Sequence, residues 1–237
     1  GHALSPGLEN NIQFPYLLLL ISGGHSQFLI VKDVNEYEQL GTTIDDALGE
    51  AFDKTAKMLN LGYPGGPAVE KFAKKGDKEF FKLPQPIINK AGCNLSFAGL
   101  KTAVLREAQK IKNNDQMKFN LAASFQETVI KILEKKTLIA FKEFEKLTKS
   151  KNKTFVIAGG VAANNSIRNN LKKLAEENNF KPIFSSLEFC GDNAAMIAWA
   201  GIQRYKKKLI NELDVMPKSR WQLDKNAKYM KGPGLKL

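Results

Sequence analysis

Two short apolar runs, each followed by a pair of glycines, dominate the hydrophobic pattern of this 237-residue chain. The first run spans residues 16–22 and precedes glycines 23–24, and the second spans residues 154–158 and precedes glycines 159–160. An apolar run of this length that is bounded by glycine predicts a buried strand. The pattern therefore predicts two buried strands that each end in a turn free of side chains.

Shorter apolar stretches and helical spacing predict the other elements. A strand antiparallel to the first is expected over residues 27–32, after a tight hairpin, and a last short strand over residues 182–185. Apolar positions at helical spacing predict helices over residues 45–60, 69–75, 118–144, 164–177 and 192–207. Asp192 is expected to cap the last helix. Residues 84–100 are expected to be irregular, and the mixture predicts an α/β fold.

The glycine pairs also indicate chemistry. Without a Cβ atom, each turn lets the backbone approach a ligand closely, and its N–H groups form a concave site for phosphate. Gly-Gly-Pro at residues 65–67 and Cys-Gly-Asp-Asn at residues 190–193 provide two further loops. We therefore predict that the two glycine pairs converge on one cleft, which holds a nucleotide at the carboxyl ends of strands.

Charge narrows the class of partner. The chain has 36 Lys and Arg against 24 Asp and Glu, which gives a formal net charge of +12 and a pI of about 9.5. This excess favours a polyanion, with nucleic acid as the first candidate, although a solvated helix surface accounts for it equally well. The longest apolar run is too short to cross a bilayer. Two well-separated cysteines, Cys93 and Cys190, favour free thiols in a cytoplasmic protein.

Six segments resemble, in order, the motifs of the TsaD family, the tRNA N6-adenosine threonylcarbamoyltransferases. They are residues 22–25, 45–57, 63–67, 96–102, 158–164 and 190–193. The resemblance runs from His2 to about Trp221. It implies an α/β fold of the actin-like, sugar-kinase-like and Hsp70-like ATPase type with two lobes. By this resemblance the chain holds the second lobe and a closing helix, and the first lobe is largely missing.

The resemblance also implies how the chain is divided. The expected parts are the end of the first lobe and its metal motif (1–15), the second lobe (16–188), a helix closing toward the first lobe (189–212) and a basic tail (213–237). On the closing helix, an apolar stripe would lose the surface against which it packs in the family. The stripe consists of Met196, Ile197, Trp199 and Ile202.

The activity implied by the resemblance is transfer of the threonylcarbamoyl group from threonylcarbamoyl-AMP to N6 of the adenosine next to the anticodon in tRNA. TsaB-like and TsaE-like proteins would be partners. A divalent metal, iron with zinc as the alternative, would be held by two His and one Asp. Here His2 and Asp192 would be ligands, and the third would precede the chain. We therefore expect weak metal binding and no activity from these 237 residues alone.

Carried over residue by residue, the family motifs imply a substrate-binding set. It consists of Leu20, Ile21, Ser22, Gly23, Gly24, Asp53, Gly66 and Asn164. Asp53 would accept hydrogen bonds from ribose hydroxyls, or else pair with Lys57 one turn later. Asn164 would bind the ligand or cap a helix. Residues 22–24 would contact the phosphate or carbonyl group, or form a plain hairpin turn.

Other residues have weaker assignments, and no catalytic residue is identified. Asp46 and Glu50 could assist removal of the amine proton, or bind structural partners. Lys101, expected in a loop, could meet phosphate, while both cysteines are expected to be inert. His2 could instead be a remnant of cloning, and Asp192 a simple helix cap.

Three rival functions remain in view. An ATPase or small-molecule kinase of the same fold is possible on fold alone, but residues 45–57 and 63–67 resemble TsaD rather than sugar kinases. A nucleotide-binding scaffold subunit gains weight if the first lobe is absent. A metalloprotease is disfavoured because the chain lacks His-Glu-x-x-His, and its histidines are His2 and His25.

Overall fold

A mixed five-stranded sheet forms the centre of the computed structural model, which describes residues 1–111, 114–217 and 221–227. The strand order is β3-β2-β1-β4-β5. The first three strands are antiparallel neighbours, whereas β4 runs parallel to β1 and β5 parallel to β4. The strands are β1 (Tyr16–Ile21), β2 (Ser26–Asp33), β3 (Glu36–Thr42), β4 (Thr154–Ala158) and β5 (Lys181–Phe184).

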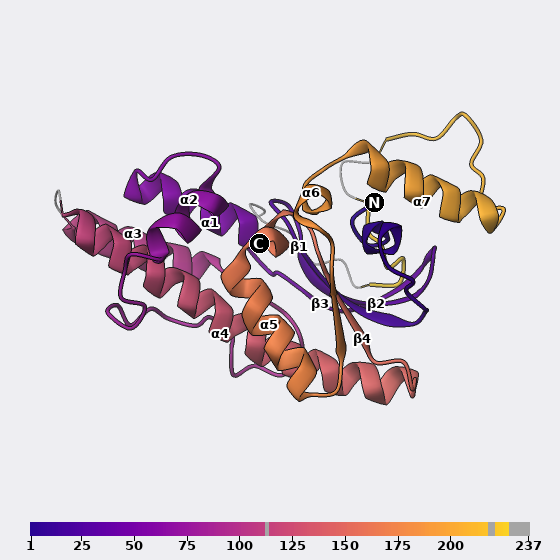
Figure 1. Ribbon diagram of the computed structural model, residues 1–237, viewed down its shortest axis with the longest axis horizontal. Helices are drawn as coiled ribbons and strands as arrows, with labels where there is room; N and C mark the ends of the chain where they lie inside the picture. The colour runs from indigo at the N-terminus through magenta and orange to yellow at the C-terminus, as the bar shows by residue number, and fades with distance from the viewer. Residues whose placement is uncertain (112–113, 218–220, 228–237) are drawn as a thin grey trace.

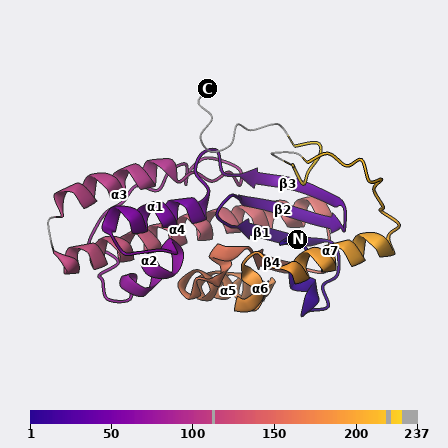
Figure 2. The same ribbon diagram turned by 90° about the horizontal axis from the view of Figure 1, so that it is seen from above.

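Helices cover the sheet unequally. Figure 1 shows α4 and α5 along one side of the sheet, with the N-terminal turn and α7 on the other side. Figure 2 shows that α1, α2 and α3 gather beyond the end of the sheet, beside the first half of α4. The helices are η1 (Ser5–Leu8), α1 (Leu48–Leu59), α2 (Gly65–Ala73), α3 (Ala98–Lys110), α4 (Asp115–Thr148), η2 (Gly160–Ala163), α5 (Asn165–Glu177), α6 (Leu187–Cys190) and α7 (Ala194–Lys206).

Strand β1 is buried on both faces, which explains its unbroken apolar sequence. Leu17, Leu19 and Ile21 join the large core beneath the helices. Leu18 and Leu20 join a smaller cluster on the opposite face, where Ala3 from the N-terminal segment also packs. Because alternate side chains of a strand point to opposite faces, covering both faces requires apolar residues throughout. The predictions of strands at residues 16–22 and 154–158 are thereby confirmed, as are those at 27–32 and 182–185.

The helix predictions are confirmed in outline and wrong at several boundaries. The helix predicted over 118–144 is one continuous helix of 34 residues, and the one predicted over 164–177 is α5. Helix α2 begins at Gly65 rather than at residue 69, because the Gly-Gly-Pro segment forms its first turn. Proline is well suited to a first turn, where its missing N–H has no partner to lose.

Two errors have one physical cause. The helix predicted to begin at Asp45 begins at Leu48 instead, and the segment predicted to be irregular contains the start of α3. The carboxylate of Asp45 accepts hydrogen bonds from the backbone N–H groups of Phe97 (2.7 Å) and Ala98 (3.1 Å). Asp45 therefore caps α3 rather than its own neighbour. Lys101, expected in a loop, lies in the first turn of α3.

The last helix also begins later than predicted. Asn193 is its cap, since its side chain accepts a hydrogen bond from the N–H of Met196 at 2.8 Å, so Asp192 is not the cap. The apolar stripe on this helix is only partly uncovered. Met196 is buried and packs against Gly1, whereas Ile197 is 60% and Ile202 49% exposed.

The C-terminal tail is described in part, because residues 218–220 and 228–237 lie outside the described residues. Within it, the carboxylate of Asp224 accepts a hydrogen bond from the N–H of Gln39 at 2.9 Å, which attaches the segment to the edge strand β3. Among the described residues, no helix combines the length and apolarity needed to span a membrane. The predicted division of the chain into four parts stays a prediction.

Candidate functional site

A cavity of about 400 Å³ lies where β1 and β4 end. Because these strands are parallel neighbours, their carboxyl ends meet at one edge of the sheet. Gly23 lines the cavity from the turn after β1, and Gly160 lines it from the turn after β4. The prediction that the two glycine pairs converge on one cleft is confirmed.

The two glycines of the second pair, Gly159 and Gly160, have different structural roles. Gly159 has a φ of +97°, and a Cβ atom there would lie 2.4 Å from the carbonyl oxygen of Ile21. This glycine is required for the close packing of the two turns. A Cβ atom on Gly160 or Gly23 would meet nothing within 4 Å, although both residues line the cavity. At those two positions the missing side chain keeps space open for a ligand.

The first glycine pair belongs to a closed hairpin. The N–H of Ser22 donates to the carbonyl of His25 at 2.7 Å, and the Ser22 hydroxyl accepts from the N–H groups of Gly24 (3.3 Å) and His25 (3.0 Å). The segment is thus a hairpin turn and a cavity wall at once. Leu20 and Ile21 have buried side chains in the two apolar clusters and support the hairpin from below.

Asp53 connects the first two helices at the cavity. One of its carboxylate oxygens accepts a hydrogen bond from the N–H of Gly65 at 2.9 Å, and both Asp53 and Gly66 line the cavity. The backbones are so close that a Cβ atom on Gly65 would lie 2.4 Å from the Cα of Asp53. The partner of Asp53 is therefore this turn, not Lys57, which was the alternative.

Glu70 is a cavity residue that the sequence reasoning missed. It lies on α2, lines the cavity, and accepts hydrogen bonds from the backbone N–H (3.0 Å) and the side-chain amide (3.1 Å) of Asn165. Its position four residues after Gly66, on the same helix face, was the signal that could have found it. With Asp53 it gives the cavity two carboxylates.

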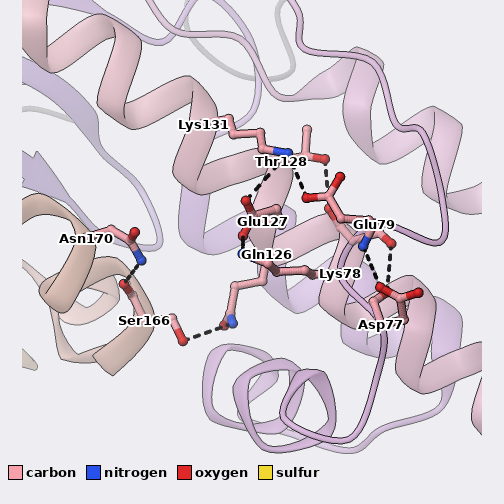
Figure 3. A network of polar contacts seen from close by, with 10 residues as sticks. Asp77, Lys78, Glu79, Gln126, Glu127, Thr128, Lys131, Ser166 and Asn170 are labelled. Carbon is pink, nitrogen blue, oxygen red and sulfur yellow. Dashed lines mark hydrogen bonds and ion pairs between the residues drawn. The ribbon is translucent and has the colours of Figure 1, made fainter.

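Asn164 lines the cavity, but its side chain is engaged within the protein. It is buried, caps α5 by accepting from the N–H of Ile167 at 3.0 Å, and donates to the side chain of Gln126 at 2.9 Å. Gln126 in turn donates to the hydroxyl of Ser166 at 3.2 Å, as Figure 3 shows. Of its two expected roles, the cap is the one that the hydrogen bonds display.

The cavity wall combines anion-attracting and apolar parts. First-turn or cap residues of α1, α2 and α5 line it, namely Gly49, Gly66, Pro67 and Asn164. Helix N-termini carry unpaired N–H groups and a partial positive charge, so they favour an anion. Phe52, Val161 and Leu187 supply an apolar wall suited to a flat ring. The cavity can thus hold a molecule with an aromatic ring, hydroxyl groups and a phosphate.

The two predicted metal ligands lie in contact. The Nε2 atom of His2 is 2.8 Å from a carboxylate oxygen of Asp192, and the side chains are 17% and 91% exposed respectively. Neighbouring ligand atoms of one metal ion lie only slightly farther apart, at about 3 Å. The donor pair therefore fits a divalent metal in part. Within the described part of the chain, no group of three His, Cys, Asp or Glu side chains completes such a site.

The remaining candidates have structural partners. Asp46 pairs with Lys101 at 2.5 Å and with Lys54 at 3.7 Å, and Glu50 pairs with Lys54. The hydrogen bond that the ammonium of Lys54 donates to Glu50 raises the pKa of Lys54. These contacts match the structural alternative for both acids. Figure 3 shows a comparable surface network on α4, in which the ammonium of Lys131 lies between two carboxylates.

Both cysteines are buried thiols. Burial raises the pKa of Cys93 to about 11 and also raises the pKa of Cys190. At neutral pH both are protonated, and a protonated thiol is a poor nucleophile. This supports the expectation that neither cysteine is reactive.

Two solved structures of HypF have a similar fold at low sequence identity. The crystal structure of full-length HypF in its phosphate- and nucleotide-bound form matches with a TM-score of 0.62 at 13% identity, covering 87% of this chain and 35% of HypF. HypF from T. kodakarensis matches with a TM-score of 0.56 at 15% identity, covering 81% and 34%. At such low identity the likeness shows the fold alone, and this α/β fold is consistent with the expected actin-like ATPase type.

Closely related sequences share one description. The tRNA N6-adenosine threonylcarbamoyltransferase of Pelagibacter ubique (strain HTCC1062) is 56% identical over all 237 residues, and that of Rickettsia rickettsii (strain Sheila Smith) is 50% identical over 226 residues, 94% of this chain. The chain spans 66% of the length of either relative. The family model described as TsaD, tRNA N6-adenosine threonylcarbamoyltransferase, matches residues 1–199, and the chain therefore belongs to the TsaD family.

Proposed function

We propose that this chain forms the nucleotide-binding part of an enzyme that transfers a threonylcarbamoyl group from threonylcarbamoyl-AMP to N6 of the adenosine next to the anticodon in tRNA. One observation carries the proposal. Both glycine turns, the first turns of helices and two carboxylates line a single cavity of about 400 Å³. Membership in the TsaD family supports this reaction, and the residues that line the cavity support binding of the adenylate there.

The lining residues suggest how the adenylate would lie. Asp53 and Glu70 are the acceptors suited to ribose hydroxyls, as carboxylates are in other nucleotide sites. The backbone at Gly23 and Gly160, with the nearby helix N-termini, suits the phosphate. Phe52 would face the adenine ring. The acyl group would then lie near the hairpin, where the Ser22 hydroxyl still has its own proton to donate.

The reaction needs positioning more than a protein nucleophile. The N6 amine attacks the carbamoyl carbon, a C–N bond forms, the C–O bond to the phosphate breaks, AMP leaves and the amine loses a proton. AMP is already a good leaving group, so the chain has to align the two substrates and stabilise negative charge on the carbonyl oxygen. Backbone N–H groups of the glycine turns are the donors suited to that charge.

We also propose a metal and partners that the family implies. His2 and Asp192 would hold a divalent ion, iron or alternatively zinc, with a further ligand from elsewhere. When bound, such an ion would act as a Lewis acid on a phosphate or carbonyl oxygen. Partners would be tRNA and proteins resembling TsaB and TsaE, in the cytoplasm. The formal charge of +12 suits the tRNA backbone.

Calorimetric titration with AMP tests the cavity assignment. Asp53→Asn keeps the size of the side chain and an acceptor for Gly65, but removes the charge. We expect affinity for AMP to fall about tenfold or more, since hydrogen bonds to a charged acceptor are worth about 1.5–3 kcal/mol. Glu50→Gln, on the same helix but paired with Lys54, is the control and should bind like the parent. Equal affinity for parent and Asp53→Asn would remove Asp53 from the site.

A further inference from the structure

A second cavity, of about 420 Å³, lies at the free edge of the sheet. It is bounded by α5, by the edge strand β5 and by Asn10 of the N-terminal segment. Three cationic side chains line it: Arg168, Lys172 and Lys181. No Asp or Glu is among the described residues that line it. The cavity is therefore cationic, in contrast to the first cavity with its two carboxylates.

These positive charges are poorly neutralised. The ammonium of Lys172 is 4.0 Å from Glu176, and both side chains are more than half exposed, so this pair contributes little. Arg168 donates to two neutral carbonyls, those of Ala162 (2.9 Å) and Ser185 (2.8 Å), and stacks over the ring of Phe184 at 4.7 Å. Carbonyls and an aromatic ring orient a guanidinium without cancelling its charge.

Arg168 also connects the two cavities. Ala162 lies between Val161 and Ala163, which line the nucleotide cavity, and Ser185 precedes Leu187, which lines it as well. The Arg168 guanidinium thus hydrogen-bonds two segments that border the first cavity, and it also lines the second cavity. A guanidinium has five N–H donors, and that of Arg168 also donates to the Sγ atom of Cys190 at 3.6 Å, so two donors remain for an anion after these three bonds. The pair of cavities is arranged so that an anion in the second lies beside the wall of the first.

We propose that the second cavity binds a phosphodiester of the RNA substrate, with Arg168, Lys172 and Lys181 as its contacts. That the anion is RNA rests on the proposed function; the cationic cavity itself does not. Exposure favours a phosphate within a chain over a free ion. Lys172 is 60% exposed, and an open, solvated rim suits a backbone that crosses the surface. Phosphate contacts of this kind set position and orientation rather than sequence preference.

Charge reversal at the rim tests the proposal. Lys172→Glu and Lys181→Glu are each compared with Lys173→Glu, which makes the same change in net charge. Lys173 is next to Lys172 on α5, 77% exposed, pairs with Glu177 at 3.8 Å and lies outside the cavity. Affinity of the full chain for a fluorescently labelled RNA hairpin is measured by anisotropy at several salt concentrations. Thermal unfolding verifies that each variant is folded.

The expected result is a loss of RNA affinity of about threefold to tenfold for Lys172→Glu and Lys181→Glu, beyond that for Lys173→Glu. The slope of log affinity against log salt should also fall by about 1 for each cavity lysine. Equal losses for Lys172→Glu and Lys173→Glu would overturn the proposal, because the overall charge of the chain would then account for them.

Two further probes separate the possible outcomes. Inorganic phosphate shows whether the second cavity binds a free anion instead of an RNA phosphodiester, and AMP shows whether the nucleotide site fails independently. If phosphate at constant ionic strength raises the melting temperature of the parent but not of Lys172→Glu, while their RNA affinities are equal, the cavity binds a free anion and the proposal is wrong. AMP affinity should be the same in parent and Lys172→Glu. If the parent fails to bind AMP yet the RNA losses appear, the proposed function fails while the RNA site stands.

Discussion

Lys136 shows how one buried side chain can fasten a long irregular segment. It is fully buried on α4, and its ammonium donates to the carbonyls of Lys90 (2.8 Å) and Gly92 (3.1 Å). Burial lowers its pKa because desolvation disfavours the charged form. The ammonium thereby satisfies two carbonyls of the segment between α2 and α3, which helical or sheet bonds do not reach.

Lys136→Met keeps the apolar stem but removes the donor. We expect the free energy of unfolding to fall by about 1–3 kcal/mol, because two buried carbonyls lose their partner. In the folded state the pKa of Lys136 lies below its ordinary value of 10.5. At pH values between the folded-state and the unfolded-state pKa, the unfolded chain therefore binds more protons than the folded chain. The stability of the parent consequently rises with pH in that window. Urea unfolding should therefore show a gap in the free energy of unfolding between parent and variant that widens as the pH rises toward 10.5. A gap independent of pH would contradict this.

The second glycine pair allows a matched test at single residues. Gly159→Ala would force an alanine to a φ of +97° with its Cβ 2.4 Å from a carbonyl oxygen, and we expect a loss of about 2–4 kcal/mol. Gly160→Ala meets nothing within 4 Å and should change stability by less than about 1 kcal/mol, while reducing AMP affinity because its Cβ enters the cavity. Thermal unfolding and calorimetry measure both. Similar melting temperatures for the two variants would refute the division of roles.

At the scale of elements, burial decided what the sequence could predict. Strand β1 is covered on both faces and therefore has an apolar sequence that is easy to recognise. Strand β3 lies at the edge of the sheet and is mostly exposed or half-buried, so it has no apolar run and was not predicted. Helix α3 buries only Leu100 and Val104, and its capping carboxylate comes from Asp45, which no local pattern could reveal.

Because Asp45 caps the start of α3, we expect its removal to destabilise that end of the helix first. Asp45→Ala leaves the N–H groups of Phe97 and Ala98 without their acceptor, and it also removes the hydrogen bond from Ser96. We expect a loss of about 2–3 kcal/mol, from a helix cap together with charge-assisted bonds. Asp45→Asn should recover part of it. Hydrogen exchange should become faster at the start of α3 before the rest of the molecule, whereas unchanged exchange there would show that the cap is dispensable.

At the scale of the whole molecule, the candidate site was predicted better than its surroundings. The convergence of the glycine turns follows from parallel strands that end at one edge, a rule that the sequence alone can invoke. The packing of the N-terminal segment on α7 does not follow from any pattern. Gly1 packs against Met196 and Gly7 against Trp199, so contacts between the two ends cover part of a stripe that was expected to be uncovered.

The contact between His2 and Asp192 joins residues that are 190 positions apart in the sequence. It leads to a prediction about how tightly the chain binds a divalent metal. Stable zinc sites usually use three or four protein ligands, and within the described part of the chain no group of three His, Cys, Asp or Glu side chains comes together to hold a metal. Weak binding is expected, because two donors leave most of the coordination sphere to water.

After dialysis against a chelator, elemental analysis should find well under one metal per chain. Zinc added back should bind weakly, and more weakly still to Asp192→Ala. Glu188→Ala removes an exposed carboxylate four residues earlier and should match the parent. One tightly held metal per chain after dialysis would mean that this chain completes the site by itself.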